Sequence, residues 1–207
     1  MNIKSKFYKS VCVSPRSYIC LLVASLVTLY SCGISASVEF DEYLSLKDHP
    51  KMKGVHLRIK PPKGWLVQEG DGPNVVKRFI GENGAYVILV KDLPTFATRN
   101  SYRDHYSDKK AMKKLIDSSM MACNAGGSIL DYELVTVARY PAIRAAYTCS
   151  MEKMGITMTL FTLSWSVFIE DKLVFFSGVT TSEQDFLDLT PTHMRTTLYA
   201  QFPEQFN

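Results

Sequence analysis

Residues 156–169 limit the possible folds more than any other part of the chain. Their sequence, ITMTLFTLSWSVFI, contains no charged residue, glycine or proline. Apolar side chains occupy both odd and even positions, so an extended segment places them on both of its faces. We therefore expect a long strand here, at the centre of a sheet.

Shorter extended segments precede and follow this run. They lie at residues 55–59, 65–68, 75–80, 85–91, 129–138, 143–154 and 173–180. Several of the breaks between them, such as 61–64 and 81–84, contain the glycine, proline and charged residues that favour tight turns. The short spacings predict hairpins and an antiparallel meander, which place the chain in the α+β class.

A helix is expected over residues 107–124, where apolar and small side chains recur on one helical face and Ser107 can cap the first turn. That face consists of Met112, Leu115, Ile116, Ser119, Met120 and Cys123. Residues 92–106, which precede it, have no such period and are expected to form a long irregular connection.

A second helix is expected over residues 186–202, at the end of the chain. Ser182 and Asp185 resemble a capping box just before it. Pro191 cannot donate a backbone hydrogen bond, so we expect the helix to be interrupted at Thr190 and Pro191.

The N-terminus has the pattern of a secretory signal. Residues 1–17 carry four positive charges and no negative charge, and residues 18–30, YICLLVASLVTLY, are apolar or weakly polar. As a helix this run would be about 20 Å long, too short for a hydrocarbon core of about 30 Å. We expect residues 1–37 to be a signal peptide, with an uncleaved signal anchor as the alternative.

Two processing sites fit this signal. The small residues SAS favour cleavage after Ala36 or Ser37. Alternatively, the sequence LYSC resembles a bacterial lipobox that would lipidate Cys32, although Tyr30 is bulkier than that pattern prefers. A lipid on Cys32 would be the chain's contact with the membrane. A polar tether to about residue 54 and a single globular domain over residues 55–207 complete the expected organisation.

The charge distribution argues against a nucleic-acid partner. Four of the 24 Lys and Arg residues precede residue 18, and the rest of the chain carries 20 basic and 20 acidic residues. Nucleic-acid-binding domains usually keep an excess of basic residues on one face. A hydrophobic content of 46% is typical of a globular protein. We therefore expect a folded domain with no nucleic-acid partner.

Two segments resemble the PsbP-like fold family. The sequence LRIKPPKGW resembles the opening strand and Pro-x-Gly-Trp turn of that family, and MTLFTLSWSVFIEDKLVFFSGVTTSEQDF resembles its last hairpin and closing helix. The resemblance covers roughly residues 55–202 and implies an α/β/α sandwich around a mainly antiparallel sheet. The family includes photosystem-associated subunits, Ran-binding Mog-type proteins and DcrB-like exported bacterial proteins. It therefore implies a fold without implying one function.

Cys123 and Cys149 are the cysteines of the predicted domain, since Cys12, Cys20 and Cys32 lie within or at the end of the signal. Two cysteines in an exported chain predict a disulfide. The alternative is a pair of buried thiols that pack as small apolar side chains. A Cys123–Cys149 bond would close a loop of about 25 residues and stabilise the fold by roughly 3 kcal/mol.

Sequence motifs for catalysis and metal binding are weak. The chain has no G-x-S-x-G, P-loop or G-x-G-x-x-G sequence, and its four histidines are scattered. Sulfur atoms of Cys149, Met151 and Met158, with Met154 nearby, would suit Cu(I), while core-filling methionines are the alternative. We predict no enzyme activity, no cofactor and no resident metal.

Aromatic and basic residues gather in the sequence SYRDHY. Tyrosine and arginine are common in the energetic centres of protein interfaces. The candidate binding residues are Tyr102, Arg103, His105 and Tyr106. The alternative is a loop that packs on its own aromatic side chains.

These observations predict an exported bacterial domain, periplasmic or lipid-anchored, that is not an enzyme and binds an unidentified protein of the cell envelope. An inhibitor or immunity-type protein is one form of this function. A periplasmic carrier of a small molecule or soft metal is the alternative, and an enzyme with a site assembled from distant residues is a third.

Overall fold

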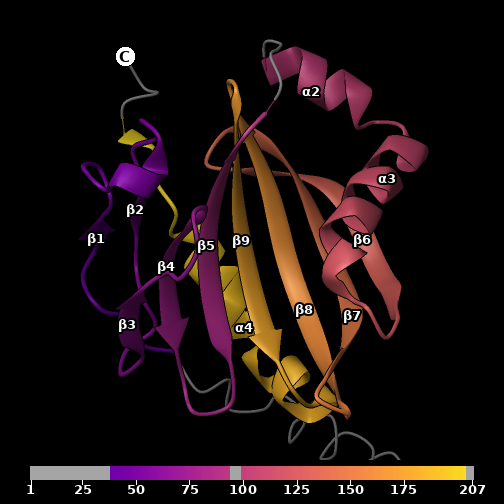
Figure 1. Ribbon diagram of the computed structural model, residues 1–207. Helices are drawn as coiled ribbons and strands as arrows, with labels where there is room; N and C mark the ends of the chain where they lie inside the picture. The colour runs from indigo at the N-terminus through magenta and orange to yellow at the C-terminus, as the bar shows by residue number, and fades with distance from the viewer. Residues whose placement is uncertain (1–37, 94–98, 204–207) are drawn as a thin grey trace, which may run out of the picture. The chain divides into compact units, whose positions relative to one another are not determined.

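The computed structural model describes residues 38–93 and 99–203. The predicted signal peptide, its processing sites and Cys32 lie outside these residues. The folded unit begins at Val38. Its main element is one antiparallel sheet, and helices lie on both of its faces (Figure 1).

The sheet has seven strands in the order β3-β4-β5-β9-β8-β7-β6, and each adjacent pair is antiparallel. The strands are β3 (Leu66–Glu69), β4 (Val75–Ile80), β5 (Ala85–Asp92), β6 (Gly127–Val137), β7 (Tyr140–Lys153), β8 (Ile156–Ile169) and β9 (Lys172–Thr180). Strand β8 lies inside the sheet, between β7 and β9, as its sequence predicted. Its last eight residues are all buried, so both of its faces are covered.

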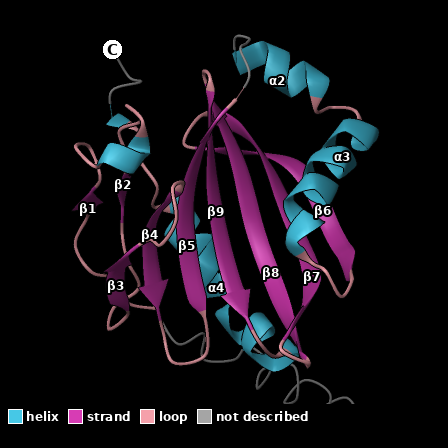
Figure 2. Cartoon of the chain, in the orientation of Figure 1, coloured by secondary structure: helices cyan, strands magenta, loops and turns pink. Residues whose placement is uncertain are grey.

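In the described part of the chain, helices on both faces of the sheet complete the α/β/α arrangement that the PsbP-like resemblance implies (Figure 2). Helices α2 (Arg99–His105) and α3 (Lys109–Ser119) lie on one face, and α3 continues into a short 3-10 turn, η2 (Met120–Ala122). Helix α4 (Glu183–Leu198) lies on the other face, against β8 and β9. Each face therefore has its own hydrophobic core, one shared with α4 and one shared with α2 and α3.

The helix over residues 107–124 is shorter than predicted. Asp108, not Ser107, is its N-cap, and the Asp108 carboxylate accepts a hydrogen bond from the backbone N–H of Lys110 at 2.9 Å. A carboxylate beside the first turn satisfies a free backbone N–H group, whereas the Ser107 hydroxyl donates to the carbonyl of Asp104. The preceding connection is also not wholly irregular, because it contains α2.

Helix α4 continues through Pro191, so the predicted interruption there is wrong. Pro191 lies on the exposed side of the helix, where water can bind the carbonyl that loses its donor. The Thr190 hydroxyl adds a bond to the carbonyl of Phe186 at 2.7 Å. The predicted cap is present, since the backbone N–H of Asp185 donates to the Ser182 hydroxyl at 3.1 Å.

The turn between β6 and β7 is two residues long, at Ala138 and Arg139, so β7 begins before the predicted segment 143–154 and includes Pro141. Pairing of β7 with β8 begins only at Ala142. Pro141 therefore has a strand neighbour on one side only, where it pairs with Thr136 of β6, and its missing N–H costs no bond on the other side.

Residues 38–54 are part of the folded unit and not a polar tether. Strand β1 (Leu44–Ser45) pairs with β2 (Arg58–Ile59), which replaces the longer strand predicted at residues 55–59. A 3-10 turn, η1 (Pro50–Met52), places the fully buried Met52 in the core shared with α4. The apolar residues of this segment are too few and too widely spaced to give a sequence pattern.

Among the described residues, His193 is the titratable histidine buried in the core under α4. Its ring lies 5.9 Å from the rings of Trp65 and Tyr86, and a Cβ atom on Gly178 of β9 would overlap it. Neither ring nitrogen has a hydrogen-bond partner among the described residues. Burial lowers the pKa of His193 from 6.5 to about 4, so the ring is neutral in the folded protein.

The buried His193 predicts a loss of stability in mild acid. The folded state binds fewer protons than the unfolded state between pH 6.5 and about 4, so the free energy of unfolding falls as the pH drops through this range. This pKa shift corresponds to about 3 kcal/mol. Urea unfolding at several pH values measures the loss.

Two variants test whether His193 causes this pH dependence of the free energy of unfolding. We expect His193→Leu to remove most of it, because leucine does not titrate. His105→Leu, on an exposed part of α2, is the matched control and should keep it. An undiminished slope in His193→Leu would contradict the assignment.

Candidate functional site

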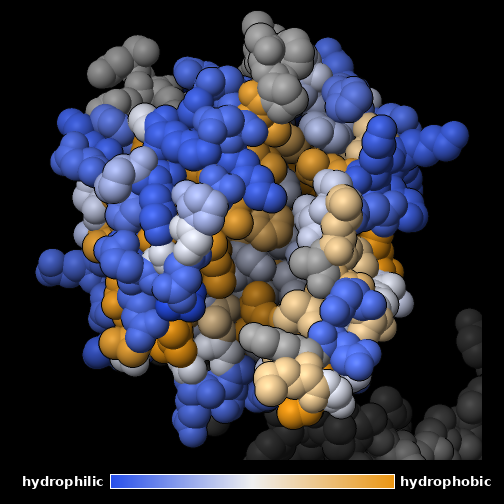
Figure 3. All heavy atoms as spheres, viewed as in Figure 1, coloured by the Kyte–Doolittle hydropathy of each residue, from blue (hydrophilic) through white to orange (hydrophobic). Residues whose placement is uncertain are grey.

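The sheet face that carries α2 and α3 is only partly covered. Figure 3 shows a hollow on this face, with hydrophobic residues inside it and hydrophilic residues around it. A cavity of about 140 Å³ on the same face has a mainly apolar lining. Its lining residues are Leu89, Lys91, Ser119, Tyr147, Leu173 and Phe175, which we call the sheet groove.

Strand register brings the groove residues together. Leu89 of β5 pairs with Phe175 of β9, and Lys91 pairs with Leu173. Directly paired residues point to the same face of a sheet, and alternate residues of one strand share that face. Tyr147 comes from β7, and Ser119 from the end of α3. The groove thus joins four elements that are far apart in the sequence.

Small hydroxyl side chains form the middle of this face. Ser164 of β8 pairs with Ser177 of β9, and Ser166 pairs with Phe175. All three serines are buried. Serine side chains are smaller than the leucine and phenylalanine side chains beside them. The surface of this sheet face is therefore recessed at the serines. We attribute the hollow to this choice of residues.

Tyr147 supplies a hydroxyl group to the groove. Burial raises the pKa of Tyr147, and a hydrogen bond with Ser164 opposes this shift. The phenol therefore stays protonated at neutral pH and can donate a hydrogen bond to a ligand.

Lys91 is the charged residue of the groove lining. The lysines nearby are paired, because Lys53 and Lys172 contact the Asp92 carboxylate at 2.5 and 3.1 Å. Within residues 38–93 and 99–203 we find no ion pair for Lys91, and its side chain is exposed. An unpaired cation at the mouth of an apolar groove favours a ligand that is apolar with an anionic or hydrogen-bond-accepting end.

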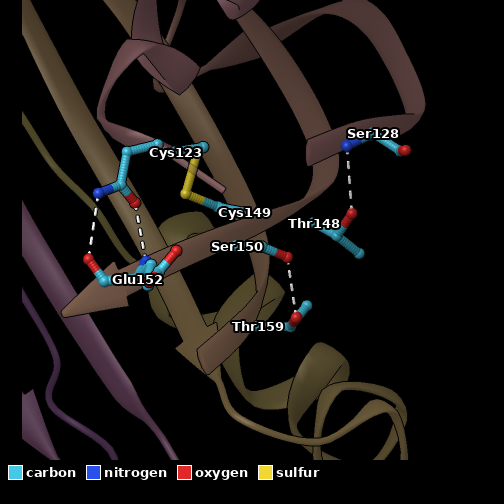
Figure 4. The surroundings of a disulfide bond; sticks show 8 residues. Cys123, Ser128, Thr148, Cys149, Ser150, Glu152 and Thr159 are labelled. Carbon is cyan, nitrogen blue, oxygen red and sulfur yellow. Dashed lines mark hydrogen bonds between the residues drawn. A yellow bond between two sulfur atoms is a disulfide. The ribbon is translucent and has the colours of Figure 1, made fainter. Parts of the chain in front are cut away.

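The predicted disulfide is present and supports the α3 side of the groove (Figure 4). It joins Cys123, just after η2, to Cys149 of β7, with a Cα–Cα distance of 5.1 Å. Cys149 lies on the same strand face as Tyr147, two residues away. The side chain of Asn124 adds two hydrogen bonds to the backbone of Glu152, at 2.8 and 3.1 Å. The end of α3 is thus fixed to β7.

Loss of the disulfide should destabilise the fold and loosen the α3 side of the sheet groove. The bond closes a loop with a sequence separation of 26 residues, for which the expected stabilisation is about 3 kcal/mol. We expect the Cys123→Ala/Cys149→Ala variant to lose that amount in urea unfolding.

Hydrogen exchange should locate the effect of this variant. Amide protection should fall more in α3 than in α4, because α4 packs on the other face of the sheet. Equal loss in both helices would contradict a local role for the bond.

The four residues predicted as a binding loop lie in and next to α2. Tyr102 and Tyr106 stack on Phe168 with ring centroids 4.9 and 4.7 Å apart, and the Tyr102 hydroxyl donates to the carbonyl of Glu170 at 2.8 Å. Burial raises the pKa of both tyrosines. The two rings therefore hold α2 on the sheet, which is the packing alternative considered for this segment.

Arg103 and His105 lie on the exposed side of α2. Arg103 donates to the Thr136 hydroxyl at 3.3 Å, and the His105 ring lies edge-on to Tyr106 at 4.7 Å. Phe168, on which the tyrosines stack, pairs with the groove residue Leu173. The predicted segment thus lies next to the groove, although its tyrosines pack inward.

The predicted soft-metal set does not come together as proposed. Cys149 is bonded to Cys123 and has no thiolate to offer a metal. Met151 and Met158 pair across β7 and β8, whereas Met154 lies in the turn between them and is 92% exposed. In the part of the chain that the structure describes, no cluster of three His, Cys, Asp or Glu residues could hold a metal ion.

Comparison with known proteins identifies the fold. No family model matches the chain, and no curated protein matches it. Cyanobacterial PsbP from Synechocystis sp. PCC 6803 superposes with a TM-score of 0.50 at 16% identity, over 84% of this chain and 99% of that one. The chain therefore has the α+β, PsbP-like fold.

Two further solved structures are similar at lower scores. The Ran-binding protein Mog1p of Saccharomyces cerevisiae gives a TM-score of 0.49 at 11% identity, over 80% of this chain and 96% of that one. A protein of unknown function from Pseudomonas aeruginosa gives 0.42 at 12% identity, over 68% and 88%. Among the described residues of this chain, no helix has the length and apolar character to cross a membrane.

Proposed function

We propose that this chain is an exported, non-enzymatic domain that binds a protein partner in the cell envelope through the sheet groove. The observation that carries the proposal is an open, mainly apolar groove with one unpaired cation at its mouth. Exposed apolar surface of this kind is typical of binding sites.

The groove lining favours binding over chemistry. A nucleophile or general acid–base group needs a partner within hydrogen-bond reach that activates it. The groove lining contains no histidine, cysteine or carboxylate, and its hydroxyl groups belong to Ser119 and Tyr147. With its raised pKa, Tyr147 acts as a hydrogen-bond donor and not as a base.

The groove size favours a side chain of a protein partner over a free small molecule. Its volume of about 140 Å³ is below the roughly 300–1,000 Å³ of most small-molecule sites. One large apolar side chain, packed onto Leu89 and Phe175, would be the usual kind of anchor of a protein interface. The carrier alternative has less support, since the disulfide also removes Cys149 as a metal ligand.

Export is supported by two independent features. Residues 1–37 have the charge and hydropathy pattern of a signal, and the Cys123–Cys149 disulfide is typical of oxidising compartments. The protein would be periplasmic after cleavage near Ala36 and Ser37, or lipid-anchored through Cys32. An inhibitor or immunity-type protein remains one specific form of this function.

Mass spectrometry of the N-terminus of protein purified from cells tests export. We expect a chain that begins at Cys32 with a lipid, or just after Ala36 or Ser37 without one. An intact N-terminal signal on the purified protein would contradict export.

Variants of the groove test the docking site. After crosslinking in cells, affinity purification and quantitative mass spectrometry should recover the partner with the wild-type protein. Leu89→Asp should lower this recovery about tenfold or more, because it places a charge in the apolar groove. Lys91→Glu should weaken recovery without disturbing the core.

Leu130→Asp is the matched control, since Leu130 is 55% exposed on the edge strand β6, outside the groove lining. It should recover the partner as the wild type does. Undiminished recovery with both groove variants would contradict the proposed site.

A further inference from the structure

Helix α4 has an unusual distribution of polar and apolar residues. Its buried face consists of Thr192, His193, Thr196 and Thr197, while Leu187, Met194 and Leu198 are 59%, 40% and 71% exposed. A helix on the surface of a globular protein normally shows the opposite pattern. The outward-facing apolar residues therefore need an explanation outside this chain's own core.

These exposed residues form a continuous row. Leu187, Pro191, Met194 and Leu198 follow at intervals of four, three and four residues, which places them along one side of the helix. We call them the outer row. The spacing is that of helices that pack lengthwise against another helix.

The apolar surface continues from the outer row onto the sheet. A groove of about 350 Å³ lies between α4 and the strands β6, β7 and β8. Met194 and Leu198 form one wall, and Val135 and Trp165 are among its sheet residues. The surface available to a partner is thus wider than α4 alone.

Two unpaired charges lie along one flank of the outer row. Asp188 and Arg195 are seven residues apart, so they lie on the same side of the helix, two turns from each other. Asp188 accepts a bond from Gln184 at 3.0 Å, and no salt bridge is found for Asp188 or Arg195 in the described part of the chain. Asp188 and Arg195 are too far apart along the helix to pair with each other. Each could pair with the opposite residue of a second molecule.

We propose that the outer row is the interface of a homodimer in which two α4 helices pack antiparallel about a two-fold axis. The axis would pass between Pro191 and Met194. Leu187 then lies opposite Leu198 of the second copy, and Pro191 lies opposite its Met194. On the flank, Asp188 pairs with Arg195 of the second copy, and the symmetry repeats this ion pair.

Charge complementarity favours a second copy over an unrelated partner. A two-fold interface uses the same patch twice, so the patch must complement itself. The apolar residues of the outer row, together with Asp188 and Arg195 on its flank, meet this requirement. A partner with an unrelated surface would give no reason for an acidic and a basic residue to lie on either side of the centre of the row.

Interface size predicts a dimer that dissociates on dilution. Helix α4 has 16 residues and is about 24 Å long, so one side of it offers a narrow contact surface. Specific interfaces bury about 800 Å² of surface on each partner. The outer row alone is too small, so the neighbouring groove must contribute. Because α4 and the sheet groove lie on opposite faces, the dimer would leave both sheet grooves open and present two sites to a partner.

Sedimentation equilibrium of the purified mature protein tests the proposal, with charge exchanges as the variants. Wild-type protein should show a reversible monomer–dimer equilibrium. Asp188→Arg and Arg195→Asp, each alone, should weaken the dimer about tenfold or more, because each brings like charges together. The double variant Asp188→Arg/Arg195→Asp should restore it, and an equimolar mixture of the two single variants should form a heterodimer.

Control variants separate association from folding. Lys110→Asp, on the exposed side of α3, should leave the equilibrium unchanged. Leu198→Glu should abolish the dimer, while its thermal unfolding stays close to that of the wild type because Leu198 is 71% exposed.

Three results would overturn the proposal. One is a wild-type protein that stays monomeric at all accessible concentrations. Another is a set of single variants that dimerise as the wild type does. The third is a double variant and a mixture that both fail to recover the dimer.

Discussion

The structure depends on the burial of strand β8 on both faces. From Thr162 to Ile169 every side chain of this strand is buried, so both surfaces of the sheet must be covered. Pairing with β7 and β9 satisfies its backbone, and the hairpins on either side keep this pairing local in the sequence. The α/β/α layering follows, with α4 on one face and α2 with α3 on the other.

Residue size then decides where the covering is incomplete. Serines on β8 and β9 lower the middle of the α3 face, and the larger Leu89 and Phe175 form the side of the resulting groove. The disulfide fixes the end of α3 to β7, two residues from the groove residue Tyr147. On the other face, α4 buries threonines and a neutral histidine, while Leu187 and Leu198 are exposed. Both candidate binding surfaces thus arise from how the sheet is covered.

Local sequence patterns predicted much of this fold. The long run at residues 156–169, the hairpins and the cysteine pair were interpreted correctly because each depends on nearby residues or on simple pairing rules. The groove could not be found this way, since Leu89, Tyr147 and Phe175 meet only through strand register. The sequence pattern does not reveal that residues 38–54 are folded, because Leu46 and Met52 are isolated apolar residues in a polar segment. Pro191 was expected to break a helix that its exposed position allows to continue.

Site-specific photocrosslinking in cells tests the central claim most directly. A photoreactive amino acid at Leu89 would lie in the sheet groove, and one at Leu130 would lie at the far edge of the sheet. We expect the disulfide-bonded protein to give a discrete crosslink to one envelope protein from position 89, and none from position 130. A crosslink from position 130 without one from position 89 would contradict the account.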